Sequence, residues 1–444
     1  MNKNVNTEYS IPDQLGFMRL SRLAPRPKNL QDTGLSRELV TDLIAKHLLD
    51  QGNLSLAALA NSLCLPGAII ETQLGFMRTE ALIEVRPNRS EDPGLIYALT
   101  DRGRATALDA MMRSGYVGPA PVSLGHYSIV TRSQSIHKQK VSRAAMERSF
   151  QGVVIEQTLL DQLGSSVNSG RAIFLYGHAG TGKTYISQRL AKLFPDLTLV
   201  PHAVSIDNHI VQLFDPLMHE VIDDSASEEA YVLNKGHDRR FNICKRPTVI
   251  TAGELTAEML EVMYEPSAKL FEAPLQMRAN NGIFIIDDLG RQRVDPKTLF
   301  NRWIVPLEER KDYLTLHSGR HFSVPFDVVL IFSTNIHPLE LADEAFLRRI
   351  GYKIEFTPMN AEAYERVWRD TCVEFEIDYD HQVLEYVINE LHARNKVHLL
   401  PCHPRDLIGM AVDHTLYTKN ERSIDIEAMH WAWRNYFVSL DTTL

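Results

Sequence analysis

The stretch that decides the fold is RAIFLYGHAGTGKTYISQRLAKL, residues 171–193. Its first six residues are mostly apolar and predict a short buried strand, and residues 185–193 predict a helix. Between them, GHAGTGKT (residues 177–184) fits the pattern GxxxxGK[ST]. This pattern binds phosphate groups when a strand precedes it and a helix follows it, which is the context found here.

Each residue type in this loop has a chemical reason to be there. The glycines let main-chain N–H groups turn toward phosphate oxygens, and the N-terminus of the following helix adds a favourable dipole. Lys183 is expected to reach the β- and γ-phosphates of a nucleotide, and Thr184 to give its hydroxyl to Mg²⁺. The residues of the loop that we expect to bind the nucleotide are Gly177, Gly180, Thr181, Gly182, Lys183 and Thr184.

Two further apolar segments end in polar residues, GIFIIDD at 282–288 and DVVLIFSTN at 327–335. The carboxyl ends of parallel strands meet at one edge of a sheet, where nucleotides bind. Asp287 is expected to hold the metal, Asp288 to polarise the attacking water, and Asn335 to hydrogen-bond to that water or to the γ-phosphate. The alternative for the two acids is that they only cap the next helix.

Taken together, these segments resemble Walker A, Walker B and sensor 1 of the AAA+ ATPases. The resemblance implies an α/β P-loop core over residues 150–358, a parallel sheet with helices on both faces, with ATP and Mg²⁺ as cofactors. FLRRI, at 346–350, is similar to the segment in which this family carries an arginine finger. That implies that Arg348 or Arg349, between which the sequence does not choose, acts on a neighbouring subunit of a ring, expected to be a hexamer.

The sequence after Pro358 has helical spacing throughout and resembles the all-α lid of AAA+ proteins, here residues 359–444. HPRDL, at 403–407, begins the third helix of this region, where the family places sensor 2. Arg405 is therefore our candidate for a contact with the γ-phosphate, the alternative being an ordinary solvated arginine. We expect helices at about 360–376, 380–394, 404–418 and 426–438.

Residues 280–325 are similar in layout to MoxR-like AAA+ proteins, with an arginine-bearing turn at Arg291 and a hairpin that faces the ring interior in that clade. Two features depart from the family. The second Walker B acid is normally Glu but is Asp288 here, one methylene shorter, so turnover is expected to be slow or nearly absent. The stretch 204–281 is long and includes a run of acids, Asp215 to Glu229, expected to be a solvated insertion.

Residues 37–116 predict three helices, a β-hairpin and a closing helix, which together resemble a winged helix-turn-helix domain. Residues 34–116 hold eight Lys or Arg against ten Asp or Glu. Binding to duplex DNA needs cations on phosphates and base edges, so this balance favours a protein partner over DNA. The expected helices are 36–50, 55–62, 66–79 and 100–112, and the hairpin strands are 81–85 and 95–99.

Two segments flank this domain. Residues 1–36 contain three prolines and are expected to form a loosely packed arm. Residues 117–149 are expected to be a solvated basic linker, with a nucleic-acid-binding patch as the alternative. Its cations are Arg132, Lys138, Lys140, Arg143 and Arg148. The stretch QLGFMR occurs twice, at 14–19 and at 73–78.

Composition limits the remaining possibilities. The chain has 444 residues, 44% of them hydrophobic and 23% charged, which excludes general disorder. It has no apolar run of the ~20 residues that cross a membrane. Its start lacks a signal-peptide pattern, and its four cysteines are far apart, which favours a reducing, cytoplasmic setting. His398, Cys402 and His403 are close in sequence but lack a fourth ligand for zinc.

The sequence thus predicts a cytoplasmic, ring-forming ATPase that remodels a macromolecular client recruited by the N-terminal domain, protein rather than DNA. Two alternatives remain open at this point. One is a DNA-associated AAA+ motor, initiator or regulator that grips duplex DNA through the N-terminal domain and the basic stretch. The other is a nucleotide-gated assembly switch with little turnover.

Overall fold

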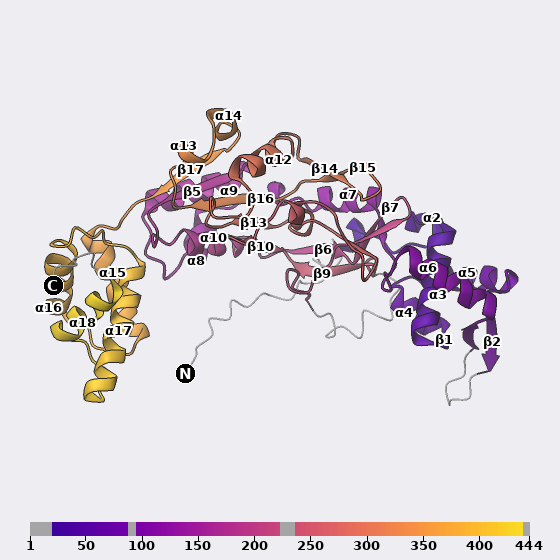
Figure 1. The fold of residues 1–444 in the computed structure, drawn as a ribbon, viewed down its shortest axis with the longest axis horizontal. Coiled ribbons are helices and arrows are strands. Elements are labelled where there is room, and N and C mark those ends of the chain that lie inside the picture. Colours follow the sequence, from indigo (N-terminus) through magenta and orange to yellow (C-terminus); the bar gives the residue numbers. More distant parts are fainter. Residues whose placement is uncertain (1–19, 88–94, 223–235, 438–444) are drawn as a thin grey trace. The chain divides into compact units, whose positions relative to one another are not determined.

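The computed structural model describes residues 20–87, 95–222 and 236–437 (Figure 1). The chain divides into two compact units. Unit 1 takes in residues 1–140, 194–285 and 292–330, and unit 2 takes in residues 141–193, 286–291 and 331–444. Both units therefore combine segments that are far apart in the sequence.

A five-stranded sheet with the order β10-β13-β16-β5-β17 carries the phosphate-binding loop. β5 (Ile173–Gly177) lies between β16 (Val329–Thr334) and β17 (Tyr352–Phe356). It pairs in parallel with both, and Ile173 lies opposite Ile331 on one side and Tyr352 on the other. The other two strands are β13 (Ile283–Ile286) and β10 (Thr248–Thr251).

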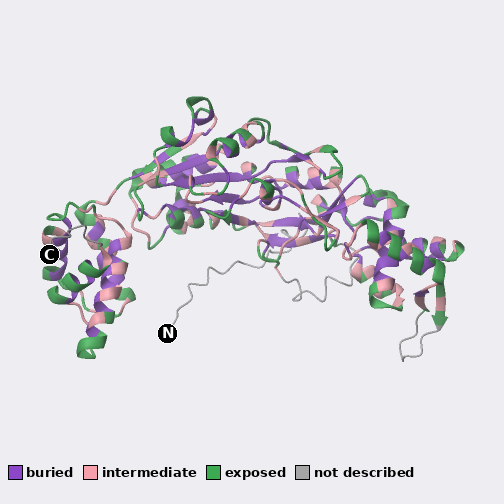
Figure 2. Cartoon of the chain, viewed as in Figure 1, coloured by how far each residue is buried: buried purple, intermediate pink, exposed green. Residues whose placement is uncertain are grey.

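The strands in the middle of this sheet are buried along their whole length. Every residue of β16 and of β13 is buried (Figure 2). Strands buried on both faces are typical of a parallel sheet covered by helices on each side. The expected α/β class is therefore confirmed. The helices of unit 2 before the C-terminal region are α8 (Arg143–Ser149), α9 (Gln157–Ser169), α10 (Lys183–Ala191), α13 (Pro338–Leu341) and α14 (Glu344–Leu347).

The C-terminal region is helical, as expected, and has a core of its own. That core is built around the fully buried side chains Tyr364 and Trp368, which pack with apolar residues of the following helices. The second expected helix changes geometry at Val387 and continues as a π-helix to His392. The α-helices are α15 (Ala361–Glu374), α16 (His381–Tyr386), α17 (Cys402–Lys419) and α18 (Ile426–Tyr436).

The first part of unit 1 contains the helices and the hairpin that the sequence predicts. Ser36, Ser55 and Thr100 each begin a helix by accepting a hydrogen bond from a main-chain N–H three residues on. A short strand, β1, pairs with the hairpin. The elements are α2 (Leu30–Thr33), α3 (Arg37–Gln51), β1 (Leu54–Ser55), α4 (Leu56–Ser62), α5 (Gly67–Thr79), β2 (Ile83–Pro87), β3 (Leu95–Leu99) and α6 (Asp101–Arg113).

Much of the long stretch 204–281 forms β-structure. A second sheet has the order β11-β12-β8-β7-β4, and β6 pairs with β9. Its inner residues, such as Val204, Ile206 and Val211, are buried in an apolar cluster, so this segment is part of the core of unit 1. Within the acidic run from Asp215 to Glu229, residues 223–229 lie outside the described residues. The strands are β4 (Val122–Ser123), β6 (Leu197–Pro201), β7 (Ala203–Ile206), β8 (His209–Gln212), β9 (Phe241–Lys245), β11 (Met263–Glu265) and β12 (Leu270–Glu272).

The expected solvated linker is also different in the structure. Its residues Val122, Tyr127 and Val130 are buried against the same apolar cluster, on β4 and on α7 (Leu124–Ser133). Apolar side chains at helical spacing pack inward here, while the cations occupy the exposed positions. The end of the expected arm is likewise packed, since Leu20 and Ala24 are buried, whereas residues 1–19, with the first QLGFMR, lie outside the described residues.

A helix and the expected hairpin precede β16 in unit 1. The hairpin joins β14 (Lys311–Thr315) to β15 (His321–Pro325), and it follows α12 (Pro296–Glu309). Short helical turns complete the chain: α11 (Leu275–Arg278) and the 3₁₀ turns Ile136–Lys138 and Glu258–Leu260. Within the described ranges, none of the helices combines the length and the apolar character needed to span a membrane.

Candidate nucleotide-binding site

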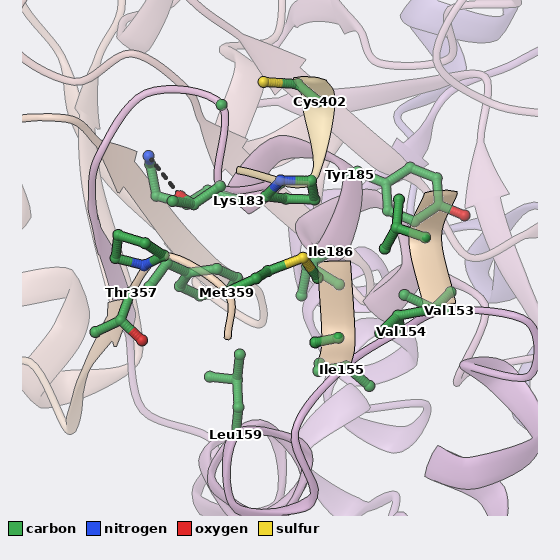
Figure 3. A pocket seen from close by; sticks show the side chains of 18 of the residues that line it. Val153, Val154, Ile155, Leu159, Lys183, Tyr185, Ile186, Thr357, Met359 and Cys402 are labelled. Carbon is green, nitrogen blue, oxygen red and sulfur yellow. Dashed lines mark hydrogen bonds between the residues drawn. The ribbon is translucent and has the colours of Figure 1, made fainter. Parts of the chain in front are cut away.

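Unit 2 contains a cavity of about 1380 Å³ at the carboxyl edge of the parallel strands (Figure 3). The phosphate-binding loop and the start of α10 line one part of this cavity. Residues 287–291 and the end of β16 form one side, and the segment before α9 together with α15 and the start of α17 form the rest. The residues that the sequence singled out in three separate motifs therefore meet in one place.

The glycines of the loop are required by its backbone. Gly180 and Gly182 have φ values of 80° and 86°, in the left-handed region that glycine adopts without strain. Gly177 has φ of 136°, and a Cβ at this position would lie 2.2 Å from the carbonyl oxygen of Phe356. A Cβ on Gly180 would lie 2.6 Å from Sγ of Cys402. The loop is thus closely packed against β17 and the start of α17.

Lys183 is buried at the centre of the loop. Its Nζ donates hydrogen bonds to the carbonyl oxygens of Gly177 (3.0 Å) and His178 (2.8 Å) and to Oδ1 of Asn335 (2.7 Å). Burial lowers the pKa of the ammonium group below 10.5, while the nearby carboxylates of Asp287 and Asp288 act in the opposite direction. The predicted lysine and the predicted sensor amide are therefore in direct contact.

The expected metal ligands are also adjacent. Oγ1 of Thr184 donates a hydrogen bond of 2.5 Å to Oδ2 of Asp287. The other carboxylate oxygen of Asp287 accepts from the main-chain N–H of Asp288 at 3.0 Å. A hydroxyl and a carboxylate oxygen side by side are the hard ligands that Mg²⁺ prefers. These two residues therefore fit a magnesium ion bound together with a nucleotide.

Asp288 is held in an unusual backbone conformation. Its φ is 48°, a left-handed value that Asp tolerates better than most residues. The next residue is fixed on both sides, because the N–H of Leu289 donates to the carbonyl of Ser333 (2.8 Å) and its carbonyl accepts from Oγ1 of Thr334 (2.7 Å). Nδ2 of Asn335 lies 3.4 Å from Oδ1 of Asp288. The two residues expected to act on water therefore face each other.

Arg405 lines the cavity from the start of α17. Its Nη2 donates a hydrogen bond of 2.8 Å to Oε1 of Glu374, the last residue of α15. The helical region also contacts the phosphate-binding loop, because the rings of His398 and His178 lie 5.2 Å apart. The structure thus places the expected sensor 2 arginine at the site.

Arg348 and Arg349 do not line the cavity of their own chain. They follow α14, and the side chain of Arg348 is 81% exposed, with Nη2 at 3.6 Å from the carboxylate of Glu344. Nη1 of Arg349 donates to the carbonyl oxygen of Ala345 at 2.7 Å. The structure therefore separates these two arginines from the other predicted site residues.

One wall of the cavity was missed by the sequence analysis. Val153, Val154, Ile155 and Leu159 form an apolar surface before and within α9, and Met359 faces them from the other side (Figure 3). An apolar slot of this kind suits the flat face of a nucleotide base. The sequence carries a signal for this wall in the run GVVIEQTLL at 152–160, whose apolar residues belong to none of the three motifs. Other lining residues that we did not predict are Arg291, Ser333, Arg366 and Asp370.

The cluster considered for zinc has an ordinary packing role at His403. This ring is buried and lies 5.1 Å from the ring of His392, and burial lowers its pKa to about 4, with a further contribution from His392. In the parts of the chain that the structure describes, no group of three or more His, Cys, Asp or Glu side chains is arranged to hold a metal ion.

Comparisons with known proteins give partial matches. Residues 120–209 match the family model of the parvovirus non-structural protein NS1, and residues 360–435 match a domain of unknown function (DUF8689). No curated protein matches the chain. Among solved structures, the Thermotoga maritima RuvB Holliday junction branch migration motor is similar over 65% of this chain and 72% of its own, at 10% identity and a TM-score of 0.36. NtrX from Brucella abortus is similar over 67% and 59%, at 12% identity and a TM-score of 0.40.

The evidence for the fold class comes from the chain itself. The site combines a strand, a glycine-rich loop around a lysine, and a helix. Two acids and an amide lie at the same edge of the sheet, and a helical C-terminal region follows. The chain therefore has an α/β fold in which a parallel sheet carries a phosphate-binding loop, and an all-α region follows it.

Proposed function

We propose that this protein binds ATP with Mg²⁺ and hydrolyses it to ADP and phosphate. The observation that carries the proposal is the meeting of Lys183, Asn335 and the Thr184–Asp287 pair in one cavity. Phosphate oxygens can replace the acceptors that Lys183 now uses, and the apolar wall around Val154 suits the base. Magnesium, when bound, neutralises charge that develops on the transferred phosphoryl group.

The residues have separate roles in this reaction. Lys183 binds phosphate oxygens, and Thr184 and Asp287 hold the metal. Asp288 accepts a proton from, or orients, the attacking water, and Asn335 fixes that water through its amide. Arg405 binds the γ-phosphate from the lid. The roles of these groups rest on the positions described above and on the AAA+ resemblance.

We propose that the active form is a ring, a hexamer, in which one subunit completes the site of the next. Support comes from Arg348 and Arg349, which lie outside the cavity of their own chain while Arg348 is almost fully exposed. An arginine supplied in trans stabilises the charge of the transition state. One of the two would act in this way, while the other has a structural role.

We further propose that the ring remodels a protein client in the cytoplasm. The helices α3 to α6 and the β2–β3 hairpin would form a winged-helix module that recruits the client, and the net negative charge of this segment favours a protein. The β14–β15 hairpin, in a MoxR-like arrangement, would contact the client inside the ring. The domains would be the arm (1–36), this module (37–116), the segment 117–149, the core (150–358) and the lid (359–444).

The decisive experiment measures steady-state ATP hydrolysis by the purified full-length protein, by Lys183→Ala and by Asp288→Asn. Hydrolysis by the wild type that both substitutions abolish is the expected result. Hydrolysis that survives Lys183→Ala would show that another protein or another site is responsible. Nucleotide binding without turnover would instead support the nucleotide-gated switch, which the short Asp288 side chain favours.

A second candidate function is a DNA-associated ATPase. The observation that favours it is the exposure of Arg132, Lys138 and Lys140 within one short stretch of unit 1. Cations that bind phosphates make affinity fall steeply with salt. Duplex DNA that stimulates hydrolysis at low salt, and loses this effect at high salt, would favour this function, whereas no binding at low salt would exclude it.

A further inference from the structure

Arg405 and Glu374 form an ion pair on the wall of the cavity. Nη2 of Arg405 lies 2.8 Å from Oε1 of Glu374, and both residues line the cavity. The two side chains are 67% and 54% exposed. Exposed pairs of this kind contribute little to stability, so the pair is easily broken.

Both charges lie at the unfavourable end of their helix. Glu374 is the last residue of α15, where the partial negative charge of the helix end disfavours a carboxylate. Arg405 is the fourth residue of α17, where the partial positive charge of the helix start disfavours a cation and favours an anion. Neither helix end stabilises its own charge, so each side chain depends on a partner from elsewhere.

The same wall carries further carboxylates. Glu362, Arg366, Asp370 and Glu374 follow one another at four-residue spacing on α15, and all four line the cavity. Residues at this spacing share one helix face. Three acids and one base therefore line the cavity in which we propose that the nucleotide binds, and Glu374 is the acid that holds Arg405.

We propose that Glu374 is a positioning residue that holds Arg405 on α15 and competes with the terminal phosphate of the nucleotide for its guanidinium group. This inference rests on the proposed function. A γ-phosphate offers Arg405 a stronger anion, placed at the favourable end of α17, and the exposed pair with Glu374 is given up in exchange. Glu374 thereby makes the transfer of Arg405 depend on the presence of the third phosphate.

The consequence is a selective effect on affinity. Without its carboxylate, residue 374 no longer competes for Arg405, so a triphosphate binds more tightly. A diphosphate does not reach Arg405 in the same way and gains little. If Glu374 contributed only to stability, its substitution would change the affinities for the two nucleotides equally or would change neither.

The test measures binding of a non-hydrolysable ATP analogue and of ADP, each with Mg²⁺, by calorimetry. The proteins are the wild type, Glu374→Gln, Arg405→Ala and the double variant. Glu374→Gln is expected to bind the ATP analogue about two- to fivefold more tightly, the range that an exposed pair allows, with ADP affinity unchanged. In the Arg405→Ala background the same substitution is expected to have no effect beyond general charge repulsion.

A matched control is Glu376→Gln. Glu376 also forms an exposed pair, with Arg422, at 3.3 Å between Nη1 and Oε2, and neither residue lines the cavity. This control is expected to leave both affinities unchanged. An unchanged or weaker ATP affinity in Glu374→Gln, or an equal gain in the Arg405→Ala background, would overturn the inference while leaving the proposed function intact. If the wild type binds neither nucleotide, the proposed function fails, and the inference fails with it.

Discussion

Nζ of Lys183 lies 2.7 Å from Oδ1 of Asn335, so the loop lysine and the amide at the end of β16 are joined directly. Two loop carbonyls and, at 3.4 Å, Oγ1 of Thr181 also accept hydrogen bonds from this ammonium group. Phosphate oxygens of a bound nucleotide must replace some of these acceptors. In the proposed reaction this exchange would release Asn335 to act on water and would link phosphate binding to the positioning of the water.

The first prediction concerns Asn335. In Asn335→Ala, Lys183 loses one competing acceptor, so ATP affinity should stay within about threefold of the wild type. Hydrolysis should fall by about 10²-fold, the usual cost of losing one preorganised hydrogen-bonding group. Comparing kcat with the dissociation constant of ATP checks this separation.

Asn335→Asp is the informative counterpart. A carboxylate beside Lys183 forms an ion pair with it and repels phosphate, so ATP affinity should fall about tenfold or more. If Asn335→Ala lost ATP binding as completely as Lys183→Ala, then Asn335 would be part of the binding loop and not a separate group that acts on water.

The second prediction concerns the backbone at Asp288, whose φ is 48°. Asn tolerates the left-handed region as well as Asp does, whereas other L-residues cost about 1–2 kcal/mol there. Asp288→Asn should therefore leave the free energy of unfolding unchanged and lower hydrolysis by about 10²- to 10⁴-fold through loss of the base. Asp288→Ala should lower both hydrolysis and stability.

Denaturant unfolding and steady-state hydrolysis, measured on the same two variants, check this prediction. The pair separates chemistry from strain because only the second variant changes the backbone preference. Equal stabilities for Asp288→Asn and Asp288→Ala would mean that the conformation of residue 288 is not strained.

The motifs of the site could be predicted from the sequence because each is local. The residues from Gly177 to Thr184 are consecutive, and Asp287 and Asn335 each end a strand of apolar residues. A parallel sheet then brings the strand ends together without further information. The lid could be predicted in the same way, because its helical spacing is strong in α15 and α18.

The rest of the structure depends on contacts between distant residues. The second sheet is built from strands of two to four residues, too short for alternation to stand out, and β4 pairs with β7 about eighty residues later. The ion pair of Arg405 with Glu374 joins two helices, and no local pattern indicates it. The burial of Tyr127 and Val130 was not predicted, because the basic residues of this segment favoured a solvated linker.

The third prediction compares two neighbouring hydroxyl groups on β16. Oγ of Ser333 is buried without a hydrogen-bond partner among the residues that the structure describes, whereas Oγ1 of Thr334 donates to the carbonyl oxygen of Leu289 at 2.7 Å. Removing an unpaired buried hydroxyl is neutral or stabilising, while removing a paired one leaves its partner unsatisfied. Ser333→Ala should therefore keep or raise stability, and Thr334→Val should lower it by about 1–3 kcal/mol.

The same pair should differ in catalysis. Thr334 fixes Leu289, the residue after Asp288, so Thr334→Val should also lower hydrolysis by displacing the acid. Thermal unfolding and ATPase assays on both variants measure the two effects. A loss of stability in Ser333→Ala comparable to that in Thr334→Val would indicate that the hydroxyl of Ser333 has a partner after all.

The last prediction is a pH dependence caused by buried histidines. Burial lowers the pKa of His202 from 6.5 to about 4. Burial also lowers the pKa of His137 to about 3, with further contributions from Arg310, Lys140 and Arg246. Between these values and 6.5 the unfolded chain binds protons that the folded chain does not, so the stability of the folded state must fall as the pH decreases below about 6.5.

His202 is the better group to test, because burial is the sole cause of its shift. Each such histidine contributes a slope of up to about 1.4 kcal/mol per pH unit. In His202→Asn the unfolding free energy should decrease less between pH 6.5 and pH 4.5 than in the wild type. The stability of the variant relative to that of the wild type should therefore rise steadily as the pH falls. Denaturant unfolding at several pH values measures this difference. A difference that is constant across the range would mean that His202 takes up a proton as easily in the folded protein as in the unfolded chain.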